Sequence, residues 1–105
     1  MKNIVLCGSL QKAEHEMEHI ADILRLTGAQ VVTPKSMEGE TNQKRQIEAH
    51  YKAIEQADLV VFINPKGYLG INSTAELGYA KGLKKEIHFL YPEKDEPCRQ
   101  ILKSL

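Results

Sequence analysis

The sequence has no excess of charge of either sign, no long hydrophobic run and only two cysteines. Lysine and arginine together number 14, as do aspartate and glutamate, so the formal net charge is zero. Proteins that bind a nucleic-acid backbone or an anionic membrane surface are usually basic, so we expect neither partner. No apolar run is long enough to cross a bilayer, and the start of the chain lacks the apolar core of a signal peptide. We therefore expect a cytoplasmic protein.

Several motifs of known chemistry are also missing. The glycine-rich fingerprints of dinucleotide-binding and P-loop proteins do not occur. Cys7 follows a strand-like segment, as the nucleophile of a Cys-x5-Arg phosphatase would, but position 13 is Ala13 instead of the phosphate-binding arginine. We interpret Cys7 as a buried thiol at a strand end, and we expect Cys7 and Cys98 to be free thiols in a reducing compartment. Among the possible partners, a small, locally bound ligand fits this composition best, and we expect no cofactor and no metal.

The chain does contain short apolar runs that alternate with helix-like stretches. Unalternated apolar runs are typical of strands covered on both faces of a parallel sheet. We predict strands at 3–7, 30–33, 58–63 and 86–90, and helices at about 12–27, 42–56, 73–83 and 98–105. The polar stretch at 35–42 is interpreted as a loop and a candidate flap. The inward positions are predicted to be Ala13, Met17, Ile20 and Leu24 in the first helix, and Ile47, Tyr51 and Ile54 in the second.

This alternation predicts a single α/β domain over residues 1–105, a flavodoxin-like or Rossmann-like three-layer αβα sandwich. Right-handed crossovers favour a four-stranded parallel sheet in the order 2-1-3-4. In that order the turn at Gly8 and Ser9 faces the loop at 64–73 across a crevice. This crevice lies at the carboxyl ends of the strands, where open α/β sheets bind ligands.

Glu76 is the residue that this geometry singles out. We expect it in the first turn of the helix after the 58–63 strand, where the helix dipole favours an ionised carboxylate. An ionised carboxylate is what a covalent glycosidase nucleophile needs. A structural alternative stays open, because Ser73-x-x-Glu76 has the spacing of a capping box, in which the glutamate only reaches back to the cap amide.

The four histidines have different expected roles. His15 and His19 fit the H-E-x-x-H pattern of zinc proteases, but the apolar positions of the same helix point elsewhere, so we expect both to face solvent. His50 lies at the edge of the apolar face of its helix, where it could protonate a leaving base or simply be a surface or half-buried residue. His88 is in mid-strand and is expected to be packed.

Taken together, the segments VLCGS, ADLVVFIN, a glycine-bearing loop and AELGYAKGLKKEIHFLYP resemble the nucleoside 2-deoxyribosyltransferase superfamily. That group includes the 2′-deoxynucleoside 5′-monophosphate N-glycosidases. The resemblance covers residues 3 to about 92 and is most specific at Glu76-Leu77-Gly78. It implies that Glu76 attacks the anomeric carbon of a deoxyribose, and that water or a second base resolves the glycosyl-enzyme. It also implies a homodimer or larger homo-oligomer. The residues that it implies for binding the sugar or 5′-phosphate are Gly8, Ser9, Gly70, Asn72 and Ser73.

Two positions depart from the N-glycosidase pattern. His50 stands where that branch has an aspartate that assists with the base, and Val5 stands where it has a tyrosine. A histidine can be a general acid. We therefore expect an enzyme that cleaves or transfers the N-glycosidic bond of a (deoxy)nucleoside or its 5′-monophosphate, with Glu76 as nucleophile, His50 as acid and Asn64 as a further substrate contact. The alternatives are a non-catalytic nucleotide-binding or sensing module, and a purely structural domain with an empty crevice.

Overall fold

A computed structural model describes residues 2–8, 10–34, 43–64 and 70–90 of the chain. The predictions for Ser9, Cys98, the loop at 35–42 and the helix at 98–105 lie outside these residues. The elements in chain order are β1 (Asn3–Cys7), α1 (Leu10–Leu26), β2 (Gln30–Val32), α2 (Gln43–Gln56), β3 (Leu59–Phe62), α3 (Ile71–Gly82) and β4 (Glu86–Phe89). No boundary of these seven elements differs from the sequence-based prediction by more than two residues.

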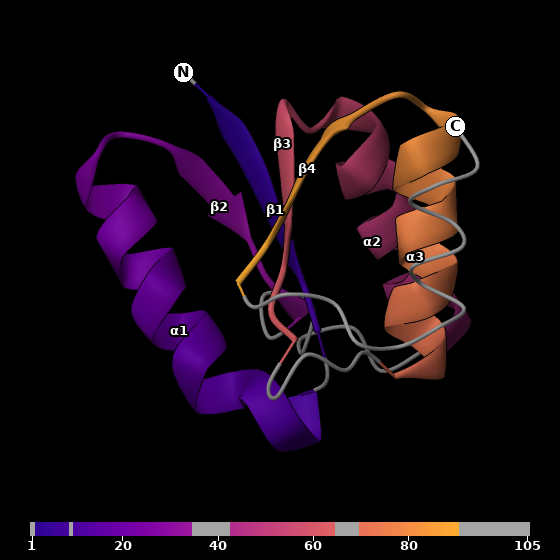
Figure 1. Ribbon diagram of the computed structural model, residues 1–105, viewed down its shortest axis with the longest axis horizontal. Helices are drawn as coiled ribbons and strands as arrows, with labels where there is room; N and C mark the ends of the chain where they lie inside the picture. The colour runs from indigo at the N-terminus through magenta and orange to yellow at the C-terminus, as the bar shows by residue number, and fades with distance from the viewer. Residues whose placement is uncertain (1, 9, 35–42, 65–69, 91–105) are drawn as a thin grey trace.

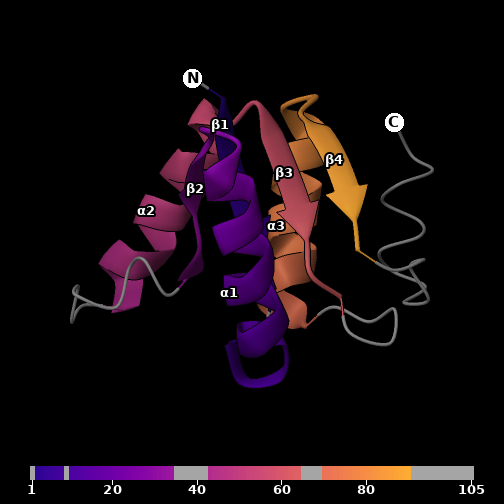
Figure 2. The ribbon, with the colours of Figure 1, turned by 90° about the vertical axis from the view of Figure 1, so that its left-hand side faces the viewer.

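The four strands form one parallel sheet in the order β2-β1-β3-β4, which confirms the predicted topology. Helix α1 covers one face of the sheet, and α2 and α3 cover the other (Figure 1). The view from the α1 side shows the same three layers from a second direction (Figure 2). No helix in the described ranges is long and apolar enough to span a bilayer.

The core consists of two clusters, one on each side of the sheet. Val5 and Cys7 of β1 point toward the α2–α3 layer, whereas Ile4 and Leu6 point toward α1. All four side chains are buried. This double burial explains why β1 is apolar at every position from 4 to 7 and lacks the alternation of a strand with one solvent-exposed face.

Two expectations about burial are wrong. His88 is exposed, with its Nε2 atom 3.6 Å from Glu86 Oε1, because β4 is an edge strand and no described helix covers that side of it. Ile47 is 48% exposed, although Ile54 on the same helix is fully buried. Ile47 lies two turns closer to the start of α2, where it borders an open groove between α2 and α3 instead of the sheet.

Candidate functional site

Three elements bring chemically reactive side chains to the carboxyl end of the sheet. Cys7 is the last residue of β1, and it pairs with Phe62, the last residue of β3. The amide of Ile63 donates a hydrogen bond to the carbonyl of Cys7 at 2.8 Å, so the ends of the two strands are held together. His50 reaches this point from α2 and Glu76 from α3.

His50 lies at the centre of the resulting cluster. Its Nε2 atom is 2.8 Å from Glu76 Oε2 and 3.4 Å from Cys7 Sγ. Cys7 and His50 are buried, and the side chain of Glu76 is only 13% exposed. At 2.8 Å the Nε2–H group donates a hydrogen bond to the carboxylate, which is the short, charge-assisted kind. The sequence singled out His50 and Glu76 separately, but it gave no indication that they touch.

The other ring nitrogen of His50 lacks a partner. Within the described residues, Nδ1 is the one buried side-chain nitrogen or oxygen atom that makes no hydrogen bond. A neutral ring with its proton on Nε2 leaves Nδ1 as an unsatisfied acceptor, and a protonated ring leaves it as an unsatisfied donor. Either state carries a desolvation cost, since a buried polar atom without a partner is unfavourable.

The capping-box explanation of Glu76 is wrong. Helix α3 begins at Ile71, its cap residue Gly70 makes no side-chain cap hydrogen bond, and Ser73 is buried in the third helical position. Because the helix begins two residues earlier than expected, Glu76 lies in its second turn rather than its first. Its carboxylate pairs with His50 across the layer and does not return to the helix start.

Comparison with solved structures identifies the fold of this chain. No family model matches the sequence, and no curated protein matches it. Among solved structures, a 2-desoxiribosyltransferase from Leishmania mexicana superimposes with a TM-score of 0.70 at 16% sequence identity, covering 85% of this chain. The chain has the fold of a deoxyribosyltransferase. It spans 63% of the length of the Leishmania enzyme. The architecture that the sequence resemblance implied is thus confirmed.

Within this deoxyribosyltransferase fold, the electrostatics around Glu76 affect two neighbouring groups. Burial, and then the negative charge of Glu76, raise the pKa of the Cys7 thiol well above its usual value. Burial, then Glu76, then Cys7, also raise the pKa of the Tyr51 phenol. Both groups therefore keep their protons at neutral pH. The sequence indicated a packing role for both residues, and the one signal for Tyr51 was its place directly after His50.

The residues predicted to bind sugar or phosphate have different environments. Gly8 is packed so closely that an added Cβ would meet the Ile63 carbonyl oxygen at 2.8 Å, so packing alone accounts for glycine there. Asn64 and Ser73 are buried, while Gly70 and Asn72 are exposed at the start of α3. The ends of β1 and β3 lie side by side, as the predicted strand order 2-1-3-4 requires, while Ser9 and residues 65–69 of the facing loop lie outside the described residues.

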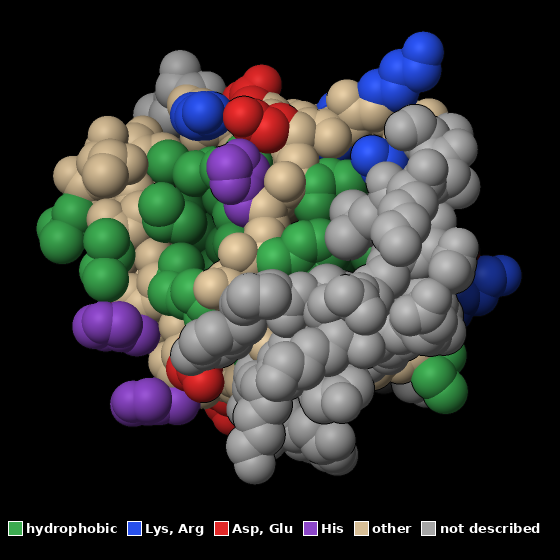
Figure 3. All heavy atoms as spheres, viewed as in Figure 1, with side chains coloured by type: hydrophobic (Ala, Val, Ile, Leu, Met, Phe, Trp, Pro, Cys, Tyr) green, Lys and Arg blue, Asp and Glu red, His purple; other side chains and the backbone are tan. Residues whose placement is uncertain are grey.

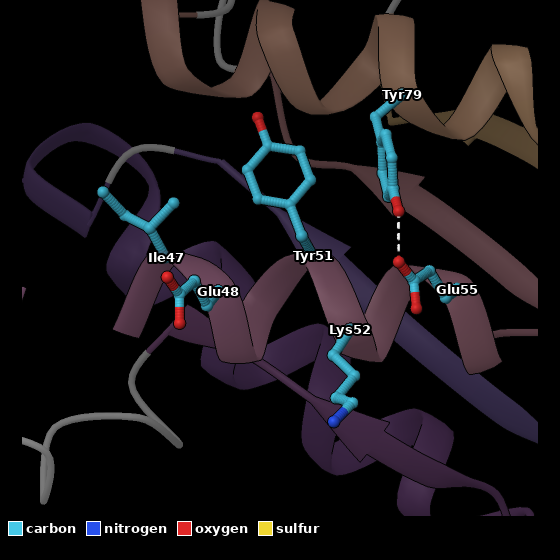
Figure 4. Close-up of a pocket in the computed structure, with 6 residues that line it drawn as sticks. All are labelled: Ile47, Glu48, Tyr51, Lys52, Glu55 and Tyr79. Atoms are coloured by element: carbon cyan, nitrogen blue, oxygen red, sulfur yellow. Dashed lines mark hydrogen bonds between the residues drawn. The ribbon is translucent and has the colours of Figure 1, made fainter. Parts of the chain in front are cut away.

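A groove lies between α2 and α3 (Figure 4). The Tyr79 hydroxyl donates to the Glu55 carboxylate across it, and the Tyr79 ring packs edge-on against Tyr51 with centroids 4.9 Å apart. Tyr51 lines this groove, and burial and then the negative charge of Glu76 raise the pKa of its phenol. The groove is lined by Ile47, Glu48, Tyr51, Lys52, Glu55 and Tyr79.

The H-E-x-x-H segment lies away from this site. His15 and His19 are both exposed on α1, as expected from the apolar face of that helix. Histidine side chains are visible on the surface in the space-filling view (Figure 3). Within the described ranges, neither residue joins a cluster of three or more potential metal ligands.

Proposed function

We propose that this protein cleaves or transfers the N-glycosidic bond of a (deoxy)nucleoside or its 5′-monophosphate, with Glu76 as the nucleophile. The observation that carries the proposal is the 2.8 Å contact between Glu76 Oε2 and His50 Nε2. The pair is nearly buried and lies where open α/β sheets bind ligands. The fold that surrounds it is that of a deoxyribosyltransferase.

In this proposal the two carboxylate oxygens have different tasks. Oε2 accepts the hydrogen bond of His50, and we assign the attack to Oε1. Oε1 attacks the anomeric carbon, the bond from that carbon to the base nitrogen breaks, and its electron pair goes to the base. Glu76 is then an ester, and water or a second base attacks the same carbon and releases the carboxylate.

His50 is the proposed acid. As the bond from the anomeric carbon to the base breaks, the protonated ring of His50 passes its Nε2 proton to the base, which leaves neutral. Tyr51 keeps its phenolic proton and presents a neutral donor near the carboxylate, since its pKa is raised. It does not add a negative charge to a site that already contains one.

A nucleotide-binding module without turnover is the second candidate, and the same contact favours it. The hydrogen bond from His50 already satisfies one carboxylate oxygen and reduces the nucleophilicity of Glu76. In this case the protein binds a nucleotide at the carboxyl end of the sheet and releases no base.

The test is incubation of the pure protein with nucleosides and 5′-monophosphates, with and without a free acceptor base, followed by chromatography. We expect released or exchanged base from the wild type and none from Glu76→Gln, which keeps the shape of the side chain. His50→Gln is expected to lower the rate about 10²- to 10⁴-fold, the usual contribution of an acid–base residue. Glu86→Gln, an exposed acid on β4, serves as the matched control and is expected to react normally.

Mass spectrometry of the wild type during turnover adds a direct measurement. A covalent adduct with the mass of the sugar moiety on the peptide that contains Glu76 is expected. Base release that is unchanged in Glu76→Gln would overturn the nucleophile assignment. No product across the panel, together with a saturable thermal shift from one nucleotide, would favour the binding module.

A further inference from the structure

We propose that Cys7, His50 and Glu76 form a binding site for one Zn²⁺ ion. The sequence shows no metal motif in these residues, because 43 positions separate Cys7 from His50. The fold nevertheless brings a thiol, an imidazole and a carboxylate from β1, α2 and α3 to one point. Binding of the ion does not depend on the proposed function; only its effect on turnover rests on that function.

The positions of the donor atoms are close to those of a tetrahedral zinc site. Zinc bonds of about 2.3 Å to sulfur and about 2.0 Å to nitrogen and oxygen place sulfur and nitrogen about 3.5 Å apart, and nitrogen and oxygen about 3.3 Å apart. The separations here are 3.4 Å from Cys7 Sγ to His50 Nε2, and 2.8 Å from that nitrogen to Glu76 Oε2. All three donors lie within 4.8 Å of one another. The first separation would need to change by about 0.1 Å and the second by about 0.5 Å to admit the ion, whereas the separation of Cys7 Sγ from the Glu76 carboxylate, bounded at 4.8 Å, would need to close to about 3.5 Å.

The donor set selects the class of metal. Thiolate and imidazole suit Zn²⁺ and similar transition metals, whereas Mg²⁺ and Ca²⁺ require oxygen ligands. Three protein ligands leave a fourth position for water. Binding removes one proton from the Cys7 thiol, so that the charges of the thiolate and the Glu76 carboxylate together balance the two positive charges of the ion.

Two features limit the expected affinity, and the first is that the Cys7 thiol must lose a proton although burial raises its pKa. The second is that, when Nε2 binds the metal, Nδ1 carries the ring proton, and the described residues offer it no acceptor. A metal-binding histidine usually donates this proton to a second group, and loss of that support costs about 10- to 100-fold in affinity. We therefore expect a moderate, reversible zinc site rather than a permanent structural one.

The bound ion would also affect the proposed reaction. It takes the carboxylate oxygen and the imidazole nitrogen that otherwise bond to each other. The ion on Oε2 withdraws electron density from the carboxylate, so Oε1 becomes a weaker nucleophile, and His50 no longer carries the transferable proton. Zinc is thus an inhibitor of the proposed reaction, and it competes with the Glu76–His50 hydrogen bond.

Titration of the full chain with Co²⁺, a spectroscopic substitute for Zn²⁺, tests the site. We expect intense visible bands of a tetrahedral ion and a sulfur-to-cobalt charge-transfer band in the near ultraviolet, both saturating at one equivalent and disappearing when Zn²⁺ is added. Cys98→Ser is expected to keep the charge-transfer band, because Cys7 is then the only thiol in the chain. Cys7→Ser is expected to lose it, and His50→Gln to weaken binding.

The double variant with alanine at His15 and His19 excludes a surface chelate and is expected to keep every band. A missing charge-transfer band in Cys98→Ser would overturn the proposal, even if Cys7→Ser fails to fold. So would a band that disappears when His15 and His19 are replaced. Cobalt bands in a protein that releases no base from any nucleoside would retain the metal site and reject the proposed function. Turnover that depends on Glu76, without cobalt bands, would support the proposed function and reject the metal site.

Discussion

Replacement of Gly8 by alanine tests how closely the turn after β1 packs on its neighbours. The added Cβ would lie 2.8 Å from the Ile63 carbonyl oxygen and 2.9 Å from Cε of Met17. The end of the Met17 side chain can move, but the Ile63 carbonyl belongs to a residue whose own amide bonds to the Cys7 carbonyl. The alanine must therefore push the ends of β1 and β3 apart. Overpacking of this kind costs about 1–3 kcal/mol.

For a domain of this size, each kcal/mol corresponds to about 4–8 °C in melting temperature. Gly8→Ala is therefore expected to melt roughly 5–20 °C below the wild type in thermal unfolding followed by circular dichroism. Gly78→Ala is the matched control, because an added Cβ in the middle of α3 meets nothing within 4 Å. Alanine is favoured over glycine in a helix by about 1 kcal/mol, so this variant is expected to melt several degrees higher. If Gly8→Ala melted with the wild type while Gly78→Ala rose, the close contact with Ile63 would be refuted.

Three further outcomes follow from burial and charge. Val60→Asp places an unpaired carboxylate in a fully buried strand position and is expected to abolish folding. A soluble variant with an unchanged melting temperature would contradict the central position of β3. Alanine at both His15 and His19 is expected to change the free energy of unfolding by less than about 0.5 kcal/mol, because both side chains are exposed. A clear drop in the denaturant midpoint of this double variant would contradict the exposed positions of the two histidines. Because the pKa of Cys7 is raised, the folded chain keeps the thiol proton at pH values where the unfolded chain has lost it. The contribution of this proton to the free energy of unfolding is therefore complete below about pH 9.0 and is lost as the pH rises further. In urea titrations at increasing pH, Cys7→Ala is expected to show a shallower decline than the wild type, and equal slopes would contradict the shifted pKa.

The order and type of the described elements could be predicted from the sequence because each depends on local pattern. The unalternated run in β1 indicated a strand buried on both faces, and both its faces are covered. The errors concern properties that depend on tertiary neighbours. His88 was expected to be packed because its strand is apolar at neighbouring positions, yet its exposure follows from the edge position of β4.

The candidate site was predictable only as separate residues. Glu76 and His50 could be proposed from motif and position, but their contact depends on how α2 and α3 pack over the end of β1. Cys7 shows why local sequence is not enough. A thiol at a strand end has the same neighbours in sequence whether or not a carboxylate and an imidazole from other helices contact it. The capping-box spacing was misleading because α3 begins two residues earlier than the sequence pattern predicted.

The central position of β1 has a consequence for how the chain assembles during synthesis. The partner of β1 on one edge, β2, follows it within about 30 residues of chain, but the partner on its other edge, β3, is synthesised about 55 residues later. Until then one side of an apolar strand stays unpaired, and His50 arrives before the carboxylate that it contacts. The cluster closes only when α3 docks on α2. A nascent chain that stops before α3 therefore cannot contain the pair of His50 and Glu76. Any activity or metal binding by this site requires that α3 has been made and has packed on α2.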